Sequence, residues 1–162
     1  MTQTIHVRDL AAQLGEPLGT SSWHEITQKQ VDLFADATWD HQWIHVDPER
    51  AATGPYGGTI AHGFLTISLA PSLIGEVFEI DGIDMMVNQG LRELKLRAAV
   101  PVGSRVRLSA TLTGHRPRPR GFTELVLGLV YEVETGDKIQ KAATGEIVLL
   151  VHEPETNGEN AA

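Results

Sequence analysis

Residues 61–78, AHGFLTISLAPSLIGEVF, constrain the fold of this chain more than any other stretch, because they are apolar on nearly every side. A helix with one apolar stripe can lie on a surface, whereas a helix that is apolar all round needs cover on every side. We therefore expect a central, buried helix here. Pro71 cannot donate the N–H of a helix interior, so it predicts a kink or break partway along.

The segments after residue 81 are long, favour β structure and are separated by short turns. They read MMVNQGLRELKLRAAV, SRVRLSATLTGHR, FTELVLGLVYEVET and KIQKAATGEIVLLV. Consecutive long strands of this kind predict an antiparallel sheet. The expected fold class is α+β, with the sheet curled around the apolar helix. One sheet would leave a face of that helix uncovered, so we expect a second copy of the chain to cover it in a homodimer.

Shorter elements are expected before the central helix. Residues 7–14 have helical spacing, and residues 21–27 alternate roughly as a strand does. Residues 27–38 begin with the Thr-x-x-Gln pattern of a capping box and predict a helix. An Asp-Pro pair predicts the start of a brief helix at residues 48–52.

Length and composition indicate one domain. The chain has 162 residues, of which 41% are apolar, enough for one core and too few for two comfortable ones. We place the domain at residues 1–152 and expect the polar residues 153–162 to be a disordered tail.

Charge and cysteine content exclude several functions. The net charge of −8 argues against a nucleic-acid partner, which would need a basic surface. The chain has no cysteine, so disulfides, a thiol nucleophile and thiolate metal sites are impossible. Neither a signal peptide nor a membrane span is evident. We expect a cytoplasmic protein.

Residues 37–49, ATWDHQWIHVDPE, crowd ionisable groups between two predicted helices in what reads as a loop. Asp40 and His45 can converge on one water molecule, because a carboxylate and an imidazole can hold it and exchange its proton. The alternative is structural. Asp40 would then cap a turn, Asp47 would cap the following helix, and His45 would pack with Trp43.

Residues 60–65, IAHGFL, form a second candidate site at the start of the central helix. Gly63 would let a ligand approach the backbone, and its free N–H could receive a developing oxyanion. A tight helix start packed under a loop would explain the same glycine. His62 fits a buried, hydrogen-bonded imidazole better than a catalyst, and we place it among the substrate-binding candidates.

Metal binding is a further possibility, with His41, His45, His62, Asp40 and Asp47 as potential ligands. These residues lack the regular spacing of metal-binding helices, and no cysteine assists them. We therefore expect no metal.

Residues 115–121, HRPRPRG, cluster Arg116, Arg118 and Arg120 in a turn between two strands. We call these three residues the arginine turn. On an acidic protein they are a candidate dock for phosphates. The alternative is a hairpin end whose arginines are solvated.

Two motifs resemble a known family. FADATWDHQWIHVDPERA and, after it, GPYGGTIAHGFLTISL resemble the MaoC-like dehydratases, also called the hydratase 2 family, and especially their nodulation-protein-N-like branch. The likeness runs from Phe34 to Leu69 and continues more loosely through VNQGLRELKLRAAVPVGSRVRL. It implies a hot dog fold, in which a sheet wraps around a long helix, and (R)-specific enoyl-CoA hydratase activity.

The resemblance implies roles for individual residues. The family's catalytic aspartate and histidine, which bind and activate water, fall on Asp40 and His45. The glycine whose N–H binds the thioester oxygen falls on Gly63. The common family form has Gly before the aspartate, where this chain has Trp39, and Asn-Pro where it has Gln42-Trp43. A bulky indole can reshape the pocket or restrict acyl length, so both tryptophans are substrate-binding candidates.

The reaction expected from the resemblance is the reversible hydration of trans-2-enoyl-CoA to (R)-3-hydroxyacyl-CoA. It needs an acyl-CoA thioester substrate and no cofactor, since the pantetheine carrier belongs to the substrate. One alternative is a hot dog acyl-CoA thioesterase, whose water would attack the carbonyl itself. A non-catalytic acyl-thioester binding subunit is the other.

Overall fold

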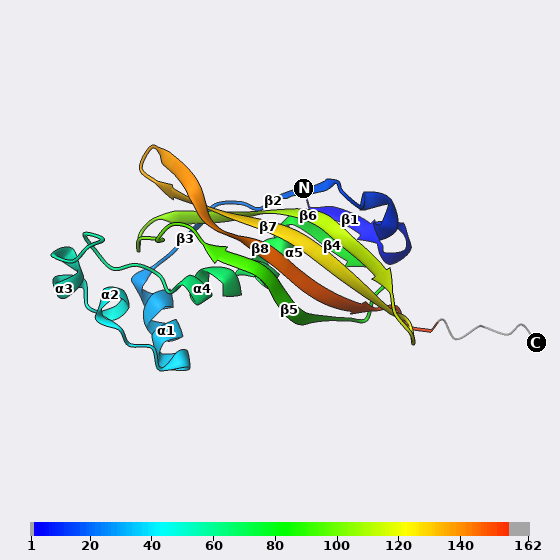
Figure 1. Cartoon of the computed structure of the whole chain (residues 1–162), viewed down its shortest axis with the longest axis horizontal. Coiled ribbons are helices and arrows are strands. Elements are labelled where there is room, and N and C mark those ends of the chain that lie inside the picture. Colours follow the sequence, from blue (N-terminus) through cyan, green and yellow to red (C-terminus); the bar gives the residue numbers. More distant parts are fainter. Residues whose placement is uncertain (1, 156–162) are drawn as a thin grey trace, which may run out of the picture.

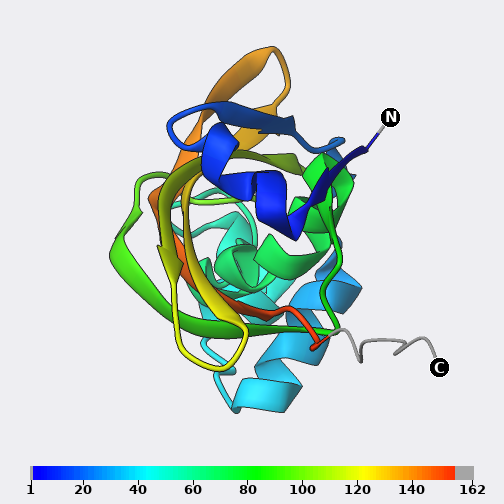
Figure 2. The ribbon, with the colours of Figure 1, turned by 90° about the vertical axis from the view of Figure 1, so that its right-hand side faces the viewer.

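The computed structural model describes residues 2–155, and its main feature is a six-stranded sheet curled around two consecutive helices (Figures 1 and 2). The strand order is β2-β6-β7-β8-β5, with the short strand β3 also paired to β6, and every pair is antiparallel. The predicted antiparallel sheet is therefore confirmed. Its strands are β2 (Pro17–Thr20), β3 (His24–Glu25), β5 (Met85–Leu96), β6 (Arg105–Pro117), β7 (Phe122–Thr135) and β8 (Lys138–His152).

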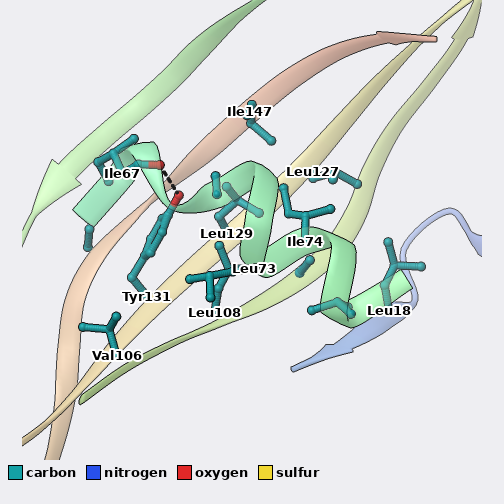
Figure 3. Close-up of a cluster of buried hydrophobic side chains, with 14 of the residues drawn as sticks. Leu18, Ile67, Leu73, Ile74, Val106, Leu108, Leu127, Leu129, Tyr131 and Ile147 are labelled. Carbon is teal, nitrogen blue, oxygen red and sulfur yellow. Dashed lines mark hydrogen bonds between the residues drawn. The ribbon is translucent and has the colours of Figure 1, made fainter. Parts of the chain in front are cut away.

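The central helix is divided where Pro71 predicts a break. Its two parts are α4 (Gly63–Ser68) and α5 (Ala70–Val77), and Pro71 is the second residue of α5. Because proline has no N–H, the carbonyl of Ile67 loses its donor one turn ahead. The Tyr131 hydroxyl on β7 donates to that carbonyl at 3.2 Å (Figure 3). Burial raises the pKa of Tyr131, so its hydroxyl keeps the proton that it donates.

The core lies between the inner face of the sheet and this divided helix. Strand residues alternate between the two faces, so every second side chain of β6 and β7 points at the helix. Phe64 on α4 is 66% exposed, which shows that the sheet does not cover the helix on every side. Figure 3 labels the core residues Leu18, Ile67, Leu73, Ile74, Val106, Leu108, Leu127, Leu129, Tyr131 and Ile147.

Three α-helices precede the central one and gather at one end of the sheet (Figure 1). α1 (Gln28–Thr38) begins with the predicted capping box of Thr27, and α3 (Pro48–Ala52) is capped by the Asp47 carboxylate, which accepts from Arg50 N–H at 3.0 Å. Both predictions are confirmed. The segment between them is not simply a loop, because Trp43–Val46 form the short helix α2.

The amino terminus contains elements that the pattern did not predict. β1 (Gln3–His6) pairs in parallel with β4 (Phe78–Asp81), the strand that follows the central helix. The helix expected at residues 7–14 is a 3-10 helix, η1 (Val7–Gln13). The strand expected over residues 21–27 is shorter, since only β3 pairs there.

Residues 156–162 of the predicted tail lie outside the described residues. Glu153, also assigned to that tail, is held in place, because its N–H donates to the Gly121 carbonyl at 2.9 Å and its carboxylate pairs with Arg8. Within residues 2–155, no helix is long and apolar enough to cross a membrane.

Candidate active site

Asp40 is positioned by the end of α1. Trp39 terminates that helix in the left-handed conformation, with φ of 60°, and so turns the chain sharply before Asp40. The left-handed region favours glycine, which is the residue that the common family form has here. The Trp39 side chain is 88% exposed and does not line the cavity described below. Trp39 therefore occupies a turn position that favours glycine, and its indole does not reach the cavity of its own chain.

His45 lies on α2 and is 6% exposed. Its Nδ1 is 2.7 Å from the Ile60 carbonyl oxygen. A carbonyl can only accept, so Nδ1 carries the proton and Nε2 keeps a free lone pair. Burial is the main cause that lowers the pKa of His45, which keeps the imidazole neutral at pH 7. The histidine is thus prepared to accept a hydrogen bond.

His62 stacks on His45, with ring centroids 3.8 Å apart and an angle of 24° between the planes. Its Nε2–H donates to the backbone carbonyl of Asp40 at 2.9 Å, so this ring holds the Asp40 loop in place. The predicted buried, hydrogen-bonded imidazole is therefore observed. His62 does not line the cavity, and its Nδ1 finds no partner among the residues described.

Asp40, His45 and His62 bring one polar side-chain atom each within 4.8 Å of the others. Such a group could suggest a metal site, but the stacked rings argue against one. A metal ion binds imidazole in the ring plane at about 2.0–2.1 Å, and two nearly parallel planes cannot both contain it. The same closeness of the Asp40 carboxylate to the His45 ring suits a water molecule held between these two residues.

Gln28 is a positioning residue that the sequence analysis missed. Its amide nitrogen donates to the His45 carbonyl at 2.7 Å and to the Asp32 carboxylate at 2.8 Å, while its oxygen accepts from the Thr59 hydroxyl at 2.6 Å. The side chain thereby ties α1 to α2 and to the segment before α4. The contact with Asp32 is local, but no local pattern predicts the contacts with His45 and Thr59, which lie 17 and 31 residues away.

A cavity of about 390 Å³ opens beside His45 and the start of α4. Gly63 lines it, and a Cβ built on Gly63 would come within 2.4 Å of the Leu96 side chain. Gly63 thus lets Leu96 pack against the helix start. Further lining residues are Tyr56, Ile60, Ala61, Thr66, Leu96, Arg97, Ala98, Ala99, Val100 and Ala142.

Two other predicted residues point elsewhere. His41 is exposed and bonds to Asp36 at 2.8 Å, which raises its pKa. Trp43 does not line the cavity. It packs against Gly54, with Arg50 stacked at 4.5 Å from its ring.

The arginine turn lies at the opposite end of the sheet from the cavity. Leu96 of the cavity pairs with Ala143, which pairs in turn with Tyr131 and then with Leu108 on β6. Arg116 follows eight residues later on β6, roughly 25 Å away at about 3.4 Å per residue. The turn therefore cannot contact a ligand in the cavity of its own chain.

Comparison with known proteins identifies a matching family and several similar proteins. Residues 9–135 match the family model of the MaoC like domain. The 3-hydroxyacyl-thioester dehydratase Z of Mycobacterium tuberculosis is 50% identical over 132 residues, covering 82% of this chain and 87% of that protein. Nodulation protein N of Rhizobium leguminosarum bv. viciae is 39% identical over 149 residues and 91% of both chains.

Solved structures agree with the sequence matches. The (R)-hydratase from A. caviae involved in PHA biosynthesis aligns with a TM-score of 0.66 at 25% identity, covering 84% of this chain and 94% of that one. The hot dog fold implied by the two motifs, and the resemblance itself, are confirmed.

Proposed function

The chain belongs to the MaoC-like dehydratase family, and we propose that it reversibly adds water to trans-2-enoyl-CoA to give (R)-3-hydroxyacyl-CoA. One observation carries the proposal: the Asp40 carboxylate, which does not itself line the cavity, lies close to His45, a neutral histidine that lines it and whose Nδ1 is engaged by the Ile60 carbonyl. The relatives named 3-hydroxyacyl-thioester dehydratase and (R)-hydratase support hydro-lyase chemistry on thioesters.

The proposed mechanism uses one water molecule held by two acceptors. It donates one hydrogen bond to the Asp40 carboxylate and the other to His45 Nε2, which leaves an oxygen lone pair directed at the substrate. Asp40 removes a proton as the oxygen bonds to C3, and the C2=C3 electron pair moves toward the thioester. C2 then takes the proton back, which completes the addition. Dehydration is the reverse sequence.

The thioester oxygen gains negative charge during this addition, and we place it at the Gly63 N–H. This N–H lies in the first turn of α4, where no intrahelical acceptor is available and no side chain caps the helix. A donor fixed beside a partly apolar cavity stabilises a developing oxyanion better than water does. Asp40, His45 and Gly63 are thus the proposed catalytic groups.

For the carrier we propose a path past Arg97. A second hollow of about 570 Å³ shares Tyr56, Ile60 and Ala99 with the cavity and continues to Lys138. Pantetheine can follow this hollow, with Arg97 at the cavity and Lys138 farther out as cations for the phosphates. Within one chain, Arg97 and Lys138 therefore take the phosphate-binding role that was expected of the arginine turn.

The homodimer remains part of the proposal, with β5 as the contact. β5 is an edge strand of 12 residues, and Met85, Met86, Val87 and Leu91 on it are 42–47% exposed. An open apolar edge of this length is rarely left unpaired in solution. If two β5 strands pair antiparallel about a two-fold axis, the arginine turn of one copy approaches the cavity end of the other. A charged residue at position 91, as in Leu91→Glu, should then yield monomers in analytical ultracentrifugation.

Product analysis tests the proposed reaction. When purified protein is mixed with a short-chain trans-2-enoyl-CoA, the ultraviolet absorbance of the enoyl thioester should decrease. Chiral analysis of the product should then show only (R)-3-hydroxyacyl-CoA. Asp40→Asn is the matched control, because it keeps the shape of the side chain and loses the base. Free CoA would instead indicate the thioesterase. Binding without turnover would indicate the non-catalytic subunit.

A further inference from the structure

Thr66 is a buried hydroxyl for which the mechanism above has no role. It lies within α4, is 2% exposed, and lines the same cavity as His45 and Gly63. Its Oγ1 has no hydrogen-bond partner in the part of the chain that the structure describes. Buried hydroxyls are nearly always hydrogen-bonded, so an unpaired one beside a cavity indicates a contact with a ligand.

Two other helical hydroxyls in this chain behave differently. Thr38 donates to the Phe34 carbonyl at 2.7 Å, and Ser68 donates to the Phe64 carbonyl at 2.6 Å, each one turn back. Such back-bonding is the usual solution for Ser and Thr inside helices. Thr66 does not adopt it, so its buried hydroxyl has no partner among the described residues, although the residue borders the cavity.

The position of Thr66 relative to Gly63 suggests which substrate atom it meets. Helix side chains lean toward the amino end, so the Thr66 side chain covers the turn that contains Gly63, three residues earlier. We propose that the Thr66 hydroxyl donates a second hydrogen bond to the thioester oxygen and is a further catalytic residue. This inference rests on the proposed function, which places that oxygen at the Gly63 N–H.

Thr66→Val tests the inference kinetically, because it keeps the branched shape and removes only the hydroxyl. A donor to a developing oxyanion acts mainly in the transition state, so we expect kcat to fall about 100-fold with little change in KM. Thr66→Ser restores the hydroxyl and should recover most of kcat. Ser68→Ala is the matched control on the same helix and should retain wild-type kinetics.

Thermal unfolding separates this role from a structural one. Replacing an unpaired buried hydroxyl by a methyl should leave Tm unchanged or raise it. If Thr66→Val lowered Tm and kcat together, or if Thr66→Ser failed to recover kcat, the hydroxyl would be structural and the inference would fail. A folded Thr66→Val variant with wild-type kcat would also overturn it.

A spectroscopic readout reports on the contact without turnover. In an Asp40→Asn background, a bound conjugated dienoyl-CoA should show a red-shifted absorbance, because donors at its carbonyl polarise the chromophore. Adding Thr66→Val should reduce the shift, and an unchanged shift would contradict the inference. If the wild-type protein failed to hydrate any enoyl-CoA, the proposed function would fall, whereas the effect of Thr66 on the shift would still show whether its hydroxyl meets the thioester.

Discussion

Tyr131→Phe tests the bond that joins the sheet to the break in the central helix. The change removes only the hydroxyl and leaves the Ile67 carbonyl, which Pro71 deprives of its helical donor, with only the Leu69 N–H at the end of α4. Tyr131 is 1% exposed, so water cannot replace the lost donor without displacing the ring. A buried group left unpaired costs about 1–3 kcal/mol, and we expect the free energy of unfolding to fall by about 2 kcal/mol.

Pro71→Ala shows whether that cost comes from the missing helical donor. Alanine supplies the N–H that can bond to the Ile67 carbonyl, so the Tyr131 hydroxyl should then become dispensable. Pro71 is exposed and lies in the first turn of α5, where proline is tolerated, so the single change should alter stability by less than about 1 kcal/mol. In the double variant the loss should be smaller than the sum of the single losses by about 1–2 kcal/mol.

Urea unfolding followed by far-ultraviolet circular dichroism measures the four proteins of this cycle. Protein concentration must be equal throughout, because the proposed homodimer would contribute to stability. Unchanged m-values are required before the free energies are compared. Additivity within about 0.5 kcal/mol would refute the reasoning, since the Tyr131 hydroxyl and Pro71 would then act independently.

Four further predictions concern the site. Asp40→Asn and His45→Gln should each lower kcat by about two to four powers of ten in steady-state kinetics on folded protein. The free-energy loss of the double variant should be far smaller than the sum of the two single losses. Because burial lowers the pKa of His45, kcat/KM should fall as the pH drops through a value below about 6.5. As the pH falls, the unfolded state binds this proton before the folded state does, so the folded state should also lose stability over that range. Trp39→Gly should stabilise the protein by about 0.5–1 kcal/mol in urea unfolding, because relief of about 1–2 kcal/mol of backbone strain exceeds the cost of the added entropy of the unfolded chain. The preference for acyl length should not change, because the indole is 88% exposed. Arg97→Gln should raise KM about 10-fold for a CoA ester and leave a pantetheine thioester unaffected, and equal effects on both would remove Arg97 from the carrier path.

Local signals allowed the helix boundaries to be predicted. Thr27 with Gln30, and Asp47 before Pro48, satisfy the first free N–H groups of their helices through contacts within three residues, so the sequence alone contains the information. β1 and β4 are different, because they pair across more than seventy residues and neither has a long pattern of its own. α2 has only four residues, too few for a helical period to show.

The site was predictable where residue chemistry and order sufficed, and not where topology decides. Asp40 and His45 were identified as candidates because they lie five positions apart in a motif, whereas Gln28 and Thr59 meet across thirty-one residues. The arginine turn was predicted from charge alone. Charge could not reveal that strand register places it at the far end of the sheet.

Gln28 has a consequence for how the active site opens. Its amide uses both hydrogens and its oxygen, on α2, on α1 and on Thr59, so none of these segments can detach without breaking a bond to the same side chain. Local unfolding should therefore release the His45 helix and the Thr59 segment together, as one cooperative unit. The residues around the proposed water site would then move together, so that they either all pack against the cavity or are all displaced from it.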